Sequence, residues 1–140
     1  MTARDIHDYN GAMLAYIGDA VIELLIREAL TLTGLSNTGK LSAAAQKLVC
    51  AKAQSEIAER LQEMLTPEEE AAYRLGRNHH TSGKPKSATA AEYSRATGLE
   101  AVFGYLHMTG NKDRIRTLFA AAYEPLLKKL EVLEGNNWIP

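Results

Sequence analysis

Two acidic residues, Asp19 and Glu100, each interrupt an otherwise apolar stretch of this 140-residue chain. Asp19 lies within Ala12–Glu28 and Glu100 within Ala96–Leu106. A carboxylate among aliphatic side chains is costly to bury unless a cation or a hydrogen-bond donor meets it. Two such carboxylates on crossed helices would form an oxygen site for Mg²⁺, which takes one or two protein carboxylates and keeps several waters. An ion held there can activate a water and neutralise charge on a phosphate.

The residue before Asp19 is also unusual for a helix. Gly18 costs about 1 kcal/mol relative to alanine in a helix interior, which indicates a close approach by another backbone or a ligand. Around it, apolar residues recur at the spacing of one helix face and predict a buried stripe: Leu14, Ile17, Val21, Leu24 and Leu25. Spacing alone also allows a plainer interpretation, in which Asp19 lies on an exposed face or caps a neighbouring helix.

Three stretches of the chain together resemble one known family. Tyr16–Val21, which reads Tyr-Ile-Gly-Asp-Ala-Val, resembles the signature helix of ribonuclease III endonuclease domains. Ala96–Leu106, with Leu-Glu-Ala at its centre, resembles the second catalytic helix of that family. Gly76–Asn78 followed by Gly83–Lys86 is similar to a segment typical of the Mini-ribonuclease III branch. The matches occur in the order of the family and extend over nearly the whole chain.

The resemblance implies an all-α ribonuclease III endonuclease fold, formed by a single domain over residues 1–140 and assembled as a homodimer. It also implies Mg²⁺-dependent hydrolysis of double-stranded RNA to 5′-phosphate and 3′-hydroxyl ends, with Asp19 and Glu100 as the catalytic, metal-binding pair. The branch matures precursors of large-subunit (23S) ribosomal RNA, so precursor rRNA is the expected substrate.

Some acids of the family pattern are missing from this chain. Full-length ribonuclease III has acids four and seven residues before its signature Asp, where this chain has Ala15 and Ala12. It also has an Asp three residues before its catalytic Glu, where this chain has Thr97. These losses match the Mini branch. They argue against a second fully liganded metal ion and suggest slower turnover or a stricter substrate preference.

Glu23 is one helical turn after Asp19, and Arg27 is one turn further. The plain interpretation is an i,i+4 ion pair worth a few tenths of a kcal/mol. The alternative is that Glu23 orients waters of the metal ion.

A local basic segment is the predicted RNA contact, because the net charge of −1 gives no overall attraction to nucleic acid. No acid interrupts the segment between Glu70 and Glu92, and a Gly- and Pro-containing loop is expected over residues 79–88. A-form RNA is recognised through phosphates and 2′-hydroxyls. The predicted RNA-binding residues are Arg74, Arg77, Asn78, Lys84, Lys86 and Arg95. A solvated face, with Asn78 simply ending a helix, is the plainer interpretation.

Local signals predict helices throughout the chain and no strands. The first helix is expected from Asn10 to near Gly34, and the second begins at Ser36 or Thr38 as cap. The third spans residues 51–65, and the fourth runs from a Thr66–Glu69 capping box to about residue 77. The fifth spans residues 90–108. The last begins after residue 111, with Pro125 either kinking it or starting another helix.

The cysteine count and the lengths of the apolar runs indicate the cellular location of the protein. A lone cysteine, Cys50, excludes an internal disulfide and fits a reducing compartment. Its neighbours Leu48 and Val49 suggest that it is a small buried hydrophobe. No apolar run approaches 18 residues, so no membrane partner is expected and the location is predicted to be cytoplasmic.

Two other functions remain open from the residues alone. One is a catalytically idle helical dimer that binds structured RNA or a ribosomal particle. The other is a generic helical protein-interaction domain, which would show no RNA affinity at low salt.

Overall fold

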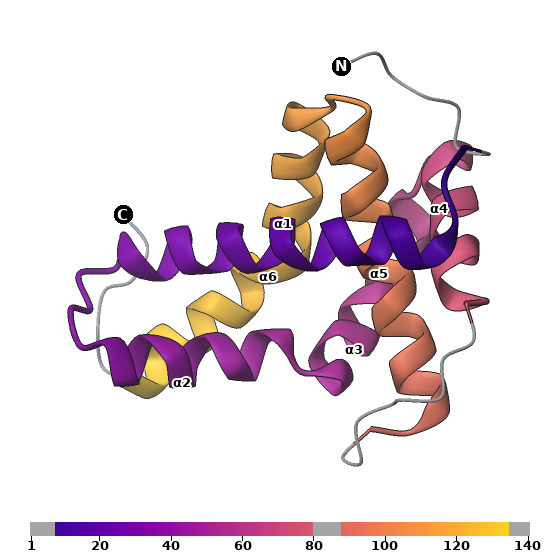
Figure 1. Cartoon of the computed structure of the whole chain (residues 1–140). Coiled ribbons are helices and arrows are strands. Elements are labelled where there is room, and N and C mark those ends of the chain that lie inside the picture. Colours follow the sequence, from indigo (N-terminus) through magenta and orange to yellow (C-terminus); the bar gives the residue numbers. More distant parts are fainter. Residues whose placement is uncertain (1–7, 80–87, 135–140) are drawn as a thin grey trace.

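The computed structural model describes residues 8–79 and 88–134, and side chains as far as residue 130 (Figure 1). Within these ranges the chain is helical and has no strand, which confirms the all-α prediction. The elements are α1 (Gly11–Thr31), α2 (Thr38–Val49), α3 (Ala51–Leu61), a 3₁₀ turn η2 (Gln62–Met64), α4 (Pro67–Arg77), α5 (Ala90–Met108) and α6 (Lys112–Glu134). None of these helices is long and apolar enough to cross a membrane.

Side-chain caps set most of the helix starts. The Asn10 side chain accepts a hydrogen bond from the Met13 backbone at 2.8 Å and begins α1 as predicted. The predicted Thr66–Glu69 capping box is present at the start of α4. The predicted cap of α2 was wrong, because Asn37 and neither Ser36 nor Thr38 caps that helix. The Asn amide oxygen lies at the Ncap position, one residue before the first helical residue, where it reaches the free backbone N–H groups.

Helix α6 continues through Pro125, so the alternative that this proline starts a new helix is wrong. Proline lacks a backbone N–H and disturbs the helical hydrogen bonds of the preceding turn. The Arg60 guanidinium donates a hydrogen bond to the Ala122 carbonyl in that turn, at 2.8 Å. This contact from α3 supports the backbone of α6 beside the interruption.

Helix α5 is the central helix, and α1 lies across it (Figure 1). The two backbones touch at a pair of glycines. A Cβ atom on Gly18 would collide with the Glu100 carbonyl and would lie 2.9 Å from the Gly104 nitrogen. A Cβ atom on Gly104 would collide with the Leu14 carbonyl. The prediction that Gly18 marks a close backbone approach is therefore confirmed.

The prediction of which α1 residues form the buried face was wrong for most of them. Leu14 is buried as expected, but Leu24 is 65% exposed, and Ile17, Val21 and Leu25 are only half-buried. The buried face instead follows Leu14, Gly18, Ile22, Ile26 and Leu30. Because α1 is apolar around most of its circumference, hydrophobic periodicity cannot choose which face packs on α5.

The predicted burial of Cys50 was also wrong. Its side chain is exposed, and the residue lies in the short break between α2 and α3. The neighbouring Leu48 points into the core, whereas Cys50 has extended backbone angles that turn the chain outward.

Candidate active site

The crossing of α1 over α5 places Asp19 beside Glu100. Asp19 is exposed and follows the glycine that contacts the Glu100 backbone, whereas Glu100 is half-buried. Burial raises the pKa of the Glu100 carboxyl, and a hydrogen bond with Asp19 and the charge of Asp19 raise it further, to about 9. At neutral pH the Glu100 carboxyl of the metal-free protein is therefore protonated, with its proton in the hydrogen bond with Asp19.

This pair fits a divalent cation of the magnesium type. Two carboxylates in contact repel each other when both are ionised, and a cation between them removes that repulsion as a shared proton does. Within residues 8–79 and 88–130, no group of three or more His, Cys, Asp or Glu side chains is arranged to hold a metal ion. Two carboxylates suit Mg²⁺, which keeps several waters in its coordination shell. The arrangement can thus supply a hard cation to a phosphate ester.

Two buried polar side chains near the acids escaped the sequence analysis. Tyr123 of α6 is fully buried, and the side chain that faces its hydroxyl is the buried amide of Gln54. Burial raises the pKa of Tyr123, and the charges of Glu100, Glu23 and Asp19 raise it further. Gln54 of α3 lies close enough to lower that pKa in part. Tyr123 also stacks on Phe119, as an ordinary core aromatic does. The sequence therefore carries no signal that sets this tyrosine apart.

Glu23 forms the plain i,i+4 ion pair. Its Oε1 lies 3.0 Å from Nε of Arg27, and the Arg27 side chain is 71% exposed. The pairing is confirmed, and a role for Glu23 in orienting metal waters stays a prediction.

The predicted RNA-binding residues of α4 lie at its exposed carboxyl end. Arg74 forms an exposed i,i+4 pair with Glu70, with 3.7 Å between the nearest nitrogen and oxygen. Arg77 lies over the Tyr73 ring, 5.8 Å from its centroid, and donates to the Asn78 side chain. Asn78 is the C-cap of α4, which agrees with the plainer interpretation of this residue.

Arg95 has partners inside the fold. Its Nε donates to the Ser55 hydroxyl at 2.7 Å and lies 3.3 Å from the Glu59 carboxylate, so it ties α5 to α3. An RNA phosphate would have to compete with both partners. Lys84 and Lys86 lie outside the described residues.

The chain is similar to known proteins along most of its length. The Ribonuclease III domain matches residues 12–111. Mini-ribonuclease 3 of Streptococcus pneumoniae is 46% identical over 116 residues, which covers 81% of this chain and 91% of the relative. The Enterococcus faecalis Mini-ribonuclease 3 is 41% identical over 117 residues, covering 82% and 89%. A crystal structure of a Fusobacterium nucleatum protein superposes with a TM-score of 0.79 at 31% identity, covering 86% of this chain and 98% of that one.

The raised pKa of Glu100 predicts how stability depends on pH in metal-free protein. A carboxyl with a pKa of about 4.5 when unfolded and about 9 when folded binds more protons in the folded state between those values. Stability therefore falls as pH rises through that window. Glu100→Gln removes the effect, so the variant should melt several degrees higher than wild type at pH 8 in EDTA and show a flatter profile.

The measurement is thermal unfolding followed by circular dichroism, with Glu124→Gln as a control at an exposed position of α6. Parallel pH profiles for wild type and Glu100→Gln would contradict the shared-proton interpretation.

Proposed function

This chain belongs to the ribonuclease III family and is an endoribonuclease of that type, and we propose that Asp19 and Glu100 are its catalytic residues. The reaction is Mg²⁺-dependent hydrolysis of double-stranded RNA, which leaves 5′-phosphate and 3′-hydroxyl ends. The observation that carries the proposal is the contact between the two carboxyl groups at the α1–α5 crossing, where burial of Glu100, and then the hydrogen bond and charge of Asp19, raise the pKa of Glu100 to about 9.

The two acids have different roles in the proposed metal site. Glu100, half-buried on the central helix, is the fixed ligand, and exposed Asp19 is the ligand that faces the RNA. Bound Mg²⁺ supplies water activation and charge neutralisation at the phosphate. Because Gly18 allows the two backbones to touch, both carboxylates are held by rigid helices and need little reorganisation.

The RNA itself is expected to contact the carboxyl end of α4, next to α5. Exposed Arg74 and Arg77 supply charge for phosphates, and Asn78 supplies an amide for a ribose or phosphate. Phosphate contacts are also proposed for Lys84 and Lys86, which lie outside the described residues. Precursor 23S rRNA is the proposed substrate, which rests on the resemblance to the Mini branch.

The surface of α1 supports the proposed homodimer. Met13 and Tyr16 are 47% and 84% exposed, which is unusual for large apolar side chains. They border an apolar hollow of about 470 Å³ near the start of α1, lined by Tyr9, Ala12, Met13, Leu14, Tyr16, Ile17 and Met108. A second copy placed here would cover these side chains and give one catalytic pair for each RNA strand.

Loss of either acid should abolish cleavage. Metal-ion catalysis contributes several kcal/mol, so Asp19→Asn and Glu100→Gln should each slow cleavage of a labelled RNA duplex by about 1,000-fold. EDTA should abolish the wild-type activity, and added Mg²⁺ should restore it. Glu28→Gln, at an exposed position of the same helix, is the matched control and should cleave normally. Cleavage that survives both substitutions would refute the site, whereas duplex binding without any wild-type cleavage would favour the idle-dimer alternative.

The dimer proposal predicts a charge-sensitive interface. Tyr16→Asp places an unpaired charge in the apolar contact and should convert the dimer to a monomer in light scattering at micromolar concentration. Leu32→Asp is the control, because Leu32 is 70% exposed just beyond the other end of α1. A monomeric wild type would contradict the two-strand arrangement.

A further inference from the structure

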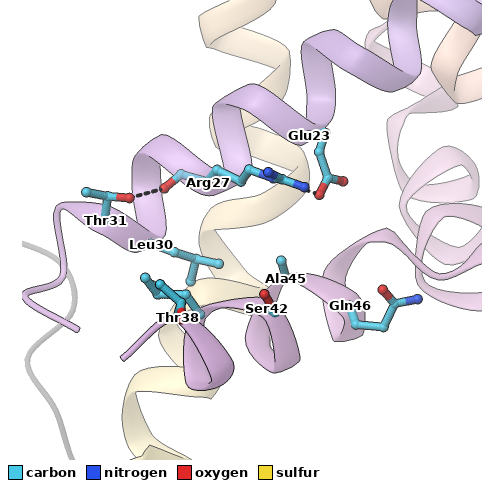
Figure 2. Close-up of a pocket in the computed structure, with 9 residues that line it drawn as sticks. Glu23, Arg27, Leu30, Thr31, Thr38, Ser42, Ala45 and Gln46 are labelled. Carbon is cyan, nitrogen blue, oxygen red and sulfur yellow. Dashed lines mark hydrogen bonds and ion pairs between the residues drawn. The ribbon is translucent and has the colours of Figure 1, made fainter. Parts of the chain in front are cut away.

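A second hollow lies between α1 and α2, away from the apolar surface near the start of α1. It has a volume of about 450 Å³, and Figure 2 shows the side chains around it. The lining combines charged, hydroxyl, amide and apolar groups: Glu23, Arg27, Leu30, Thr31, Thr38, Leu41, Ser42, Ala45 and Gln46. This mixture differs from the nearly wholly apolar hollow beside Tyr16.

The polar groups form two rows that face each other. Helix α1 contributes residues at i, i+4 and i+8, and α2 runs back alongside it with the same spacing (Figures 1 and 2). The α1 row consists of Glu23, Arg27 and Thr31, and the α2 row of Thr38, Ser42 and Gln46. The apolar part of the lining comes from Leu30, Leu41 and Ala45. The hollow is therefore a groove with polar side chains along both sides and apolar side chains between them.

The groove leads toward the catalytic pair. Glu23 lies one turn after Asp19, which is about 6 Å along the helix axis, and Arg27 lies about 12 Å from Asp19 on the same scale. A nucleic-acid strand that passes Asp19 and follows α1 toward its carboxyl end would therefore enter the groove within a few nucleotides. The proposed dimer surface occupies the opposite end of α1 and leaves the groove open.

The guanidinium of Arg27 is available to bind a phosphate in the groove. Among the described residues, the Arg27 guanidinium pairs with the Glu23 carboxylate, and exposed ion pairs contribute little to stability. Arginine can bind phosphate oxygens through two parallel hydrogen bonds, so Arg27 can exchange its exposed carboxylate partner for a phosphate.

We propose that this groove binds the ribose–phosphate backbone of duplex RNA a few nucleotides from the cut, with the Ser42 hydroxyl and the Gln46 amide on 2′-hydroxyls and Arg27 on a phosphate. The inference deepens the proposed function and rests on it. Hydroxyl and amide side chains both donate and accept hydrogen bonds, as a 2′-hydroxyl does. The groove therefore selects RNA over DNA, because DNA lacks that group.

The test compares Ser42→Ala/Gln46→Ala with the control Gln62→Ala/Thr117→Ala. The control removes the same kinds of group at exposed positions outside the groove, where each side chain donates to the carbonyl four residues earlier in the chain, Ala58 and Asp113. Alanine is the best helix former, so the groove variant should fold. Affinity is measured with Ca²⁺ in place of Mg²⁺, using an all-ribose duplex and duplexes with 2′-deoxy positions scanned along one strand.

Wild type and control should lose about fivefold in affinity for each 2′-hydroxyl contact removed, at positions a few nucleotides from the cut. The groove variant should bind the all-ribose duplex about 25-fold more weakly and lose that position-specific penalty. Arg27→Gln should instead reduce the slope of log affinity against log salt by about 1.

Two results would overturn the inference: wild type without any 2′-deoxy penalty near the cut, or a groove variant with unchanged affinity and penalty. Cleavage in Mg²⁺ is assayed separately. If wild type shows the penalty but does not cleave, the proposed function falls and the groove stands as a binding site. If wild type cleaves but the groove variant behaves like the control, only the groove inference falls.

Discussion

The backbone contact between Gly18 and Gly104 is the constraint on which the rest of the structure depends. Helices that carry side chains at their crossing lie 8–10 Å apart, and a Cβ atom at either glycine would strike the partner backbone. The close crossing brings Asp19 and Glu100 into contact, although 81 positions separate them in the chain. The same crossing buries Glu100 and raises the pKa of its carboxyl to about 9, so in the proposed site a cation would relieve the repulsion between the two acids.

Helix α1 serves three surfaces at once. Its buried face packs on the core, its exposed apolar residues near the start form the proposed dimer surface, and its polar row begins at Asp19 and continues through Glu23 and Arg27. In the proposed dimer these surfaces follow one another along a single rigid helix. The order from interface to catalytic pair to groove gives a duplex a straight path outward from the twofold axis.

Local signals predicted the helices, whereas only a resemblance to a known family singled out Asp19 and Glu100 as a pair. Thr66 and the acid three residues later specify a helix start by short-range hydrogen bonds, and the structure confirms that box. Burial of individual side chains was less predictable. Leu24 is exposed because α1 is apolar on most sides. The contact from Arg95 to Glu59 spans 36 positions and leaves no local pattern, so the sequence did not predict that Arg95 joins two helices. Its contact with RNA stays a prediction.

The central claim is that one divalent cation binds between the two acids at the crossing. The most direct measurement is anomalous diffraction from crystals soaked in Mn²⁺, which accepts the same oxygen ligands as Mg²⁺. The account predicts a peak within bonding distance of both Asp19 and Glu100, and no such peak in crystals of Glu100→Gln. A well-defined Mn²⁺ peak at other residues, or two carboxyl groups that point apart in the soaked crystal, would contradict it.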